Sequence, residues 1–557
     1  MKLKYIILSS VVATSLYAAS NVPNINDALK QVKPPKIERE KADIPQIKPQ
    51  EEKAPKELGE GKKIEIKKFL IQGAIHLSND ELKIIVEPFE NQELSFNQML
   101  EITSLITKAY REKGYFVARA YIPQQNILTQ NGSLKINIIE GNYGKFHLEN
   151  NSLVKDEIIQ ANLDDIKEEN IVSSQTLERA MLIINDTPGV VVNKAEVRPG
   201  KELGTSDFII GTQATTPYNG YVIADNYGSQ YTGKHRIMAG VDINSPFKLG
   251  DKITAFAMTS EQTGLLSGKV GYEFPLHANG TRGELSYSKT TYELGSTYQN
   301  LDAIGSSDSI VARVSYPIIR TRLENLNSYT QVSYNIMKDE IQSTNSIVKK
   351  DSVVATAGVN YTKDELILTK NSQTRASVSL SIGELGFDDV ADKQNDEAGA
   401  NTQGNFSKIN LELGKDIELL PTLRWENTLQ AQYALGNKNL DGSQDLSVGG
   451  INGVKFYPDG EESAENGYIY NSELLYTLPS FQGINSKVSI FYDIGRVYMS
   501  KNIDNEPSRT LQDVGLGYYG SYKEFFLNTH LAYNIAHEVT SQSDYGNRVM
   551  IQAGWVF

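Results

Sequence analysis

The sequence predicts two α+β modules followed by a transmembrane antiparallel β-barrel of about 16 strands. The first observation is composition: the 557 residues are only 39% hydrophobic and include 30 Tyr and 43 Gly. Beyond the N-terminus we find no run of about 18 apolar residues, which a membrane helix needs. The second is a β-α-α-β-β order that occurs twice in residues 62–213. The third is an alternation of apolar and polar residues after that point, as in barrel strands.

The first 61 residues contain three segments. Residues 1–19 have a basic start, a short apolar run and small residues at the end, which predicts a signal peptide. An anchor helix is the alternative, although the apolar run is short for one. Residues 20–32 are a candidate short helix with Asn26 or Asp27 near its N-cap, and a disordered tail is the alternative. Residues 33–61 are rich in Pro and charge, which predicts an unfolded linker.

The two modules are assigned to residues 62–142 and 143–213. In the first we expect a strand at Ile64–Gln72, helices at Ser78–Phe89 and Phe96–Lys113, and strands at Ala118–Ile122 and Ser133–Glu140. In the second we expect a strand at Lys145–Glu149, helices at 154–161 and 174–185, and strands at Val190–Arg198 and Thr205–Thr212. Each module is therefore a small sheet with two helices.

Residues 214–557 are divided into roughly sixteen alternating strands separated by polar or Gly-containing turns. Val353–Tyr361 and Phe525–Ile535 are typical. A barrel of this size encloses an aqueous lumen rather than a packed core. A periplasmic all-β sandwich is the alternative, but strand number and Tyr abundance favour the barrel.

The last strand indicates that the outer face of the barrel contacts lipid. Its apolar face carries Val549, Ile551, Ala553, Trp555 and Phe557. One apolar and one mixed face are what a barrel wall requires. The terminal Phe557, with Trp555, resembles the assembly signal that the barrel assembly machinery recognises in bacterial outer-membrane barrels.

Several other functions find no support. The net charge of −13 argues against nucleic acid, and the absence of Cys excludes disulfides and thiol chemistry. The six His lack metal-ligand spacing, so we expect neither a metal nor a cofactor. Gly228–Lys234 begins like a P-loop, but His235 replaces the required Ser or Thr. No nucleophile elbow and no acid/base pair stands out, so we expect no catalytic residues and no enzyme.

Several motifs in order carry a family resemblance. They are Ile106–Gly141, with its Pro123-x-Gln125 pair; the hairpin from Asp225; Tyr316-Pro317 with Arg320-Thr321-Arg322; Gly449–Pro458; and Phe491–Gly495. Together they resemble the outer-membrane transporters of two-partner secretion, the ShlB/FhaC/HecB-type haemolysin secretion/activation family of the Omp85 superfamily. The resemblance runs from about residue 20 to the C-terminus. It implies that the two modules are POTRA modules in the periplasm below an outer-membrane barrel.

The resemblance also implies a loop anchor in the lumen. The long sixth loop, about 436–467, carries Val454, Lys455, Phe456 and Tyr457, and the F-x-D-x-G strand carries Phe491, Asp493 and Gly495. Strand phase directs Asp493 into the lumen, because a charge facing lipid would cost a few kcal/mol. Lys455 stands where the family has arginine, which keeps the charge but loses the bidentate fork. We expect Lys455 to pair with Asp493; a solvated lumen charge is the alternative.

The function implied is export of an unfolded secreted partner, of the adhesin, haemolysin or haem-binding type, from the periplasm to the cell surface. The POTRA pair would capture the chain by β-augmentation, or alternatively act as a spacer. Residues 20–32 would plug the barrel. The rival functions are an Omp85-type factor that inserts barrels into the outer-membrane lipid and a diffusion porin; the latter does not explain the modules.

Overall fold

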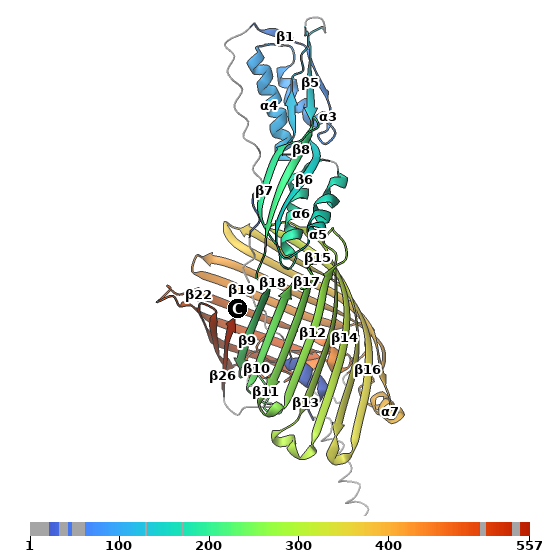
Figure 1. Cartoon of the computed structure of the whole chain (residues 1–557). Coiled ribbons are helices and arrows are strands. Elements are labelled where there is room, and N and C mark those ends of the chain that lie inside the picture. The colour runs from blue at the N-terminus through green and yellow to red at the C-terminus, as the bar shows by residue number, and fades with distance from the viewer. Residues whose placement is uncertain are drawn as a thin grey trace, which may run out of the picture.

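The computed structural model describes residues 22–32, 43–46, 62–127, 131–169, 171–501, 508–536 and 546–557. The predicted signal segment and most of the predicted linker lie outside these ranges. Two modules stand one above the other on one end of a barrel (Figure 1). We call this end the module end and the opposite one the far end. Within the described ranges, every helix is too short or too polar to cross a bilayer.

The first module is a three-stranded sheet of order β2-β5-β4 with a separate two-stranded sheet, β1-β3. Its elements are β1 (Ile64–Ile66), β2 (Lys68–Gln72), α3 (Asn79–Val86), η1 (Glu87–Phe89), β3 (Gln92–Leu94), α4 (Phe96–Glu112), β4 (Arg119–Tyr121) and β5 (Ser133–Ile139). β2 runs parallel to β5. Both helices begin with a capping box, Ser78 with Glu81 and Ser95 with Gln98.

Two predictions for this module are corrected. The single strand Ile64–Gln72 is wrong, because it is two strands in two sheets. Ile66 and Phe69 are both buried although they are three residues apart, so one strand of period two could not bury both. The helix predicted to Phe89 ends as α-helix at Val86 and continues as the 3₁₀ turn η1, which contains Pro88. Strand β3 was missed because it has three residues, two of them polar.

The second module has the predicted order of elements. They are β6 (Asn142–Asn151), α5 (Asp156–Asp165), η3 (Ile166–Glu169), α6 (Ser174–Asp186), β7 (Val191–Pro199) and β8 (Thr205–Gln213). β8 lies between β6 and β7, parallel to the first and antiparallel to the second. Its core joins the apolar face of α6 to Phe146 and Phe208, whose rings stack at 5.3 Å.

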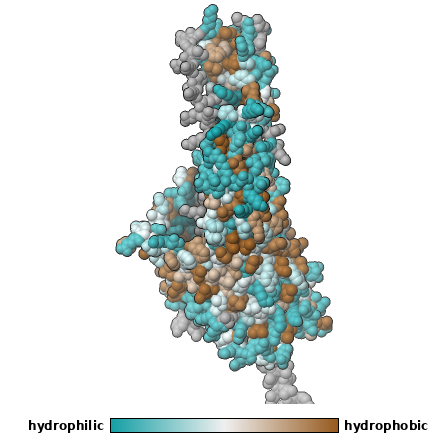
Figure 2. All heavy atoms as spheres, viewed as in Figure 1, coloured by the Kyte–Doolittle hydropathy of each residue, from teal (hydrophilic) through white to brown (hydrophobic). Residues whose placement is uncertain are grey.

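The barrel is closed and antiparallel, and its sixteen strands confirm the predicted fold class. They are β9 (Tyr218–Asp225), β10 (Arg236–Asn244), β11 (Lys252–Ser260), β12 (Leu265–Pro275), β13 (Arg282–Glu293), β14 (Ala303–Arg320), β15 (Glu324–Ile341), β16 (Ser346–Ile367), β17 (Lys370–Phe387), β18 (Gly404–Leu420), β19 (Leu423–Ala434), β22 (Asn466–Thr477), β23 (Asn485–Tyr498), β24 (Thr510–Tyr522), β25 (Phe525–Asn534) and β26 (Asn547–Val556). β26 pairs with β9 and closes the ring. Apolar residues gather on its outer surface, whereas the modules and the far end are mainly hydrophilic (Figure 2).

The strands differ in length around the barrel. β14 to β18 have 17 to 22 residues, whereas β9 to β12 have 8 to 11. Figure 1 shows β14 and β16 reaching past their shorter neighbours at the far end. The far-end loops include η4 (Glu261–Thr263), η5 (Ser296–Leu301), η6 (Gln342–Thr344) and α7 (Val390–Ala398).

Two segments pack against the inner side of the wall. The loop between β19 and β22 carries η7 (Gly442–Gln444), β20 (Leu446–Ser447) and β21 (Ser463–Ala464), and it forms an apolar cluster with β22 to β26. Helix α2 (Ile25–Gln31) forms a second cluster with residues of β9 to β17. Figure 1 shows this helix in blue within the outline of the barrel. The lumen therefore contains two pieces that are not strands of the wall.

Candidate functional site in the barrel lumen

The structure brings Lys455 and Asp493 together inside the barrel. Lys455 Nζ lies 2.9 and 3.1 Å from the two carboxylate oxygens of Asp493, and both residues are buried. Asn471 on β22 donates its amide to Asp493 Oδ1 and to the carbonyl of Gly453, each at 2.7 Å. Lys455 Nζ also lies 4.3 Å from the centre of the Phe491 ring, in cation–π geometry. The ammonium is thus enclosed by one carboxylate and one aromatic face.

A second carboxylate, Asp513, belongs to the same site and was missed by sequence reasoning. It lies directly opposite Asp493 in the β23–β24 register and is completely buried. One oxygen accepts a hydrogen bond from the backbone amide of Phe456. Among the described residues, no donor reaches its other oxygen, Oδ1. Only the register of β24 against β23 reveals the pair, because no motif in the sequence contains both residues.

The rest of the loop tip is held by side-chain and backbone contacts together. Val454 and Tyr457 are fully buried, and the Tyr457 hydroxyl donates to Asn534 Oδ1 at 3.0 Å. Arg548 on the last strand donates to the Tyr457 carbonyl at 2.7 Å, a contact that the sequence did not suggest. Phe456 packs edge-on against Tyr457 with ring centres 5.0 Å apart. The tip therefore contacts β23, β24, β25 and β26 at once.

Gly495 leaves room for this loop. A Cβ atom at this position would lie 3.0 Å from Cβ of Val448, which is itself fully buried in the loop. Such a separation is shorter than van der Waals contact, so a larger residue would push the loop away from β23. The glycine of the F-x-D-x-G segment is thus explained by close packing.

Helix α2 is held at both ends. Its N-cap is Asn24, so Asn26 and Asp27, predicted near the N-cap, lie two and three residues after it. The Asn24 side chain accepts from the backbone amide of Asn26, and Asp27 completes the capping box. The free amide of Ile25 donates to Asp339 on β15 at 2.8 Å. At the other end, the Gln31 carbonyl accepts from Arg236 on β10 at 2.8 Å.

The helix also touches both the first and the sixth loops. The Gln31 side-chain oxygen accepts from the Ser229 amide and the Thr232 hydroxyl, both at 3.0 Å. Lys30 Nζ donates to Ser463 Oγ at 2.6 Å. Arg236, which binds the helix C-terminus, is itself paired with buried Asp225 at 2.8 Å. These polar contacts therefore hold α2 to the wall in addition to its apolar cluster.

The C-terminal residues lie at the closure of the barrel. Backbone bonds join Phe557 and Gly220 in both directions, at 2.8 and 3.0 Å. The Trp555 and Phe557 rings are 4.5 Å apart and both are about half exposed on the outer face. Gly220 is needed here, because a Cβ would lie 2.5 Å from the Phe557 ring. Phe557 thus extends the pairing of β26 with β9.

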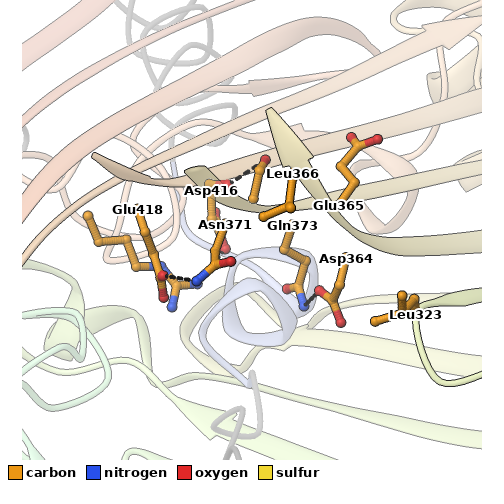
Figure 3. A pocket seen from close by; sticks show the side chains of 10 residues that line it. Leu323, Asp364, Glu365, Leu366, Asn371, Gln373, Asp416 and Glu418 are labelled. Carbon is orange, nitrogen blue, oxygen red and sulfur yellow. Dashed lines mark hydrogen bonds and ion pairs between the residues drawn. The ribbon is translucent and has the colours of Figure 1, made fainter. Parts of the chain in front are cut away.

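A pocket at the module end is lined by several carboxylates (Figure 3). Asp416 is paired with Arg375 and Arg424, Glu418 accepts from Asn371, and Asp364 accepts from Gln373. These ion pairs and hydrogen bonds join neighbouring strands at the module end of the lumen. Among the described residues, no group of three His, Asp or Glu side chains is arranged to hold a metal ion.

A closed 16-stranded barrel with two POTRA-like modules defines an outer-membrane protein of the Omp85 type, with its modules in the periplasm. Residues 64–141 match the ShlB-type POTRA domain. Residues 204–519, more than half of the chain, match the haemolysin secretion/activation protein family ShlB/FhaC/HecB. The chain belongs to this family.

Relatives and solved structures agree with the assignment. The heme/hemopexin transporter protein HuxB of Haemophilus influenzae (strain 86-028NP) is 28% identical over 446 residues, 79% of this chain and 77% of that protein. The outer membrane transporter CdiB of Dickeya dadantii is 23% identical over 74% of this chain and 72% of its own length. CdiB from Escherichia coli has the same fold, with a TM-score of 0.72 over 99% of this chain and 98% of its own, at 18% identity.

The protein is therefore an outer-membrane transporter that exports a partner protein. The expectation of export is confirmed over that of a barrel insertion factor. A BamA structure from Haemophilus ducreyi shares the fold at a TM-score of 0.51 and 13% identity, which is a likeness of fold alone. The module end is thus the periplasmic end, and the far end is the extracellular one.

Proposed function

We propose that this transporter exports one large exoprotein of the adhesin, haemolysin or haem-binding type, and that it does so without catalysis. The observation that carries the proposal is the content of the lumen. The sixth loop and α2 both pack inside it, and neither forms a strand of the wall. Helix α2 could therefore leave the lumen while the barrel stays closed.

In this proposal α2 is the plug of the resting pore. Its bonds to Asp339, Arg236, Ser229 and Ser463 are few and polar, and water could replace them one by one. Buried contacts of Ile25 and Ala28 add apolar stabilisation. Helix α2 is short and is not a strand of the barrel, so the strands of the wall keep their own pairing when it leaves.

The sixth loop has the opposite role in the proposal. Its tip is fixed by a buried ion pair and by bonds from four strands, so we propose that it stays anchored while α2 leaves. The anchored tip would keep one side of the lumen rigid. The extended partner chain would pass along the other side, where α2 had been.

The periplasmic modules would receive the partner. In the part of the chain that the structure describes, the outer strands of the sheets β2-β5-β4 and β6-β8-β7 each have a neighbouring strand on one side only, and such edges capture extended chains by adding a strand. We also propose that Trp555 and Phe557 present the strand that the barrel assembly machinery recognises, and that the apolar outer surface contacts outer-membrane lipid.

Proteoliposomes test the export proposal. The purified transporter would be reconstituted with its modules outward, and the N-terminal fragment of a candidate exoprotein would be added from urea. We expect the fragment to become protease-resistant inside the vesicles without nucleotide. A variant lacking residues 62–213 is the control and should not protect it. Failure of the complete protein to protect the fragment, together with faster insertion of an added eight-stranded barrel, would support the insertion factor.

A further inference from the structure

A short piece of the N-terminal segment lies against the junction between the second POTRA module and the barrel. Ile44 is 3% exposed and belongs to the apolar cluster of that module, with Leu182. Arg322, on the turn between β14 and β15, donates Nη2 to the carbonyls of Ile44 and Pro45 at 3.0 and 3.2 Å. Its Nη1 pairs with Asp43. One guanidinium therefore holds three consecutive residues.

The guanidinium is positioned from the module side. Arg322 Nε lies 3.4 Å from Glu178 on α6, and the Arg322 backbone amide donates to the same carboxylate at 3.3 Å. The neighbouring Arg320 pairs with Asp186 at the end of α6. A fork fixed in this way can aim its remaining donors at the carbonyls of an extended chain. The Arg320-Thr321-Arg322 segment, singled out in the sequence, thus joins module, barrel and N-terminal segment.

We propose that residues 43–46 are a periplasmic latch that holds the plug helix on a short tether. The latch rests on the proposed plug role of α2. Eleven residue steps separate Val32, just after α2, from Asp43. Without the latch, the next described point is residue 62, thirty steps away. At about 3.3–3.6 Å per residue, the tether would reach about 40 Å with the latch and about 100 Å without it.

The tether length sets how quickly a released helix returns. For an unfolded linker, the effective concentration of the tethered group falls roughly as the −3/2 power of linker length. Lengthening the tether from eleven to thirty steps therefore lowers it about 4- to 5-fold. The latch should raise the rate of pore closing by that factor and leave the conductance of the open pore unchanged.

Planar-bilayer recordings of the full-length protein test the rate. Ile44→Asp puts a charge into the apolar cluster of the second POTRA module, which should release residues 43–46 and lower the closing rate about 4- to 5-fold. Leu203→Asp is the matched control, because Leu203 is an exposed leucine of the same module, and it should not change the rate. Heat-modifiable mobility checks that each barrel is folded. A closing rate of Ile44→Asp equal to that of the parent would overturn the latch.

Thiol labelling tests whether residue 44 is buried against the second module. The chain has no Cys, so Ile44→Cys introduces a single thiol. Maleimide should label it at least tenfold more slowly than Leu203→Cys, and adding Arg322→Ala should remove most of that difference. Equal labelling of the two single variants would overturn the latch.

A deletion of residues 22–32 separates the latch from the plug. If the deletion opens the pore and Ile44→Asp has no effect, the latch is wrong and the plug survives. If the deletion leaves the conductance unchanged, the plug is wrong and the tether has nothing to retain, whatever the thiol labelling shows.

Discussion

Replacement of Lys455 by alanine should release the sixth loop from the lumen wall. The change removes the Lys455 ammonium beside Asp493 and Asp513 and leaves two buried carboxylates opposite each other. Two charges about 3 Å apart attract by about 5 kcal/mol at an effective dielectric constant of 20. Breaking a buried pair costs about 3–5 kcal/mol, and water in the lumen should bring the cost to the lower end. We expect about 3 kcal/mol.

This cost translates into a large change in the population of the open loop. About 1.4 kcal/mol changes an equilibrium tenfold, so the open form of the loop should become about 100-fold more populated. Limited proteolysis of the inserted barrel measures that population, because cleavage follows the open fraction when opening is fast. Secretion of the partner should fall while the amount of folded barrel stays the same. Lys349→Ala, at an exposed lysine of the extracellular end, is the control.

The partner variants sharpen the prediction. Asp493→Ala should cost less than Lys455→Ala, because Asp513 still offers the buried ammonium a carboxylate. Lys455→Arg should be tolerated or should improve the anchor, since the guanidinium has a second nitrogen for Asp513 Oδ1. The double variant gives the coupling energy. Additive effects in that cycle, or full secretion by both alanine variants, would refute the anchor.

Four further outcomes are expected. Deleting Phe557 should lower the outer-membrane level of heat-modifiable barrel, because its two backbone bonds extend the closing pair of strands; unchanged levels would contradict this. The isolated residues 62–213 should bind the unfolded N-terminal part of the partner weakly, measured by calorimetry or NMR shifts, and no binding alongside normal secretion by a barrel without modules would refute the receptor role. Gly495→Leu should expose the sixth loop to protease at a cost of about 1–3 kcal/mol while the barrel still inserts; a loop as resistant as the parent's would disprove the packing argument. Burial alone would raise the pKa of Glu140, but the bonds that it accepts from the first POTRA module outweigh this and lower it, so the module should lose stability as pH falls below about 4. Thermal unfolding of Glu140→Gln should show about 1–3 kcal/mol lost at pH 7 and a smaller difference at pH 3; a constant difference would argue against the linkage.

The sequence predicted the architecture because periodicity records which face of each element is buried. The alternation of apolar and polar residues in β23 is sufficient to direct Asp493 into the lumen. The contacts of Asp513 and Arg548 with the loop tip could not be predicted, since they depend on which residues of different strands lie opposite one another. The sequence does show the change of phase between Ile66 and Phe69. A single polar residue, Lys67, separates the two strands, however, and such a short break is hard to distinguish from one continuous strand.

The unequal strand lengths give the extracellular opening a tall side and a low side. At about 3.3 Å per residue, the 22 residues of β16 extend about 70 Å, whereas the 8 residues of β9 extend about 26 Å. A spanning strand needs only about 9–11 residues, so the tall side stands well clear of the bilayer. A chain that emerges from the pore therefore meets a screen on one flank and open water on the other. The first part of the exoprotein to fold should do so over the low side, sheltered on one flank from the crowded cell surface.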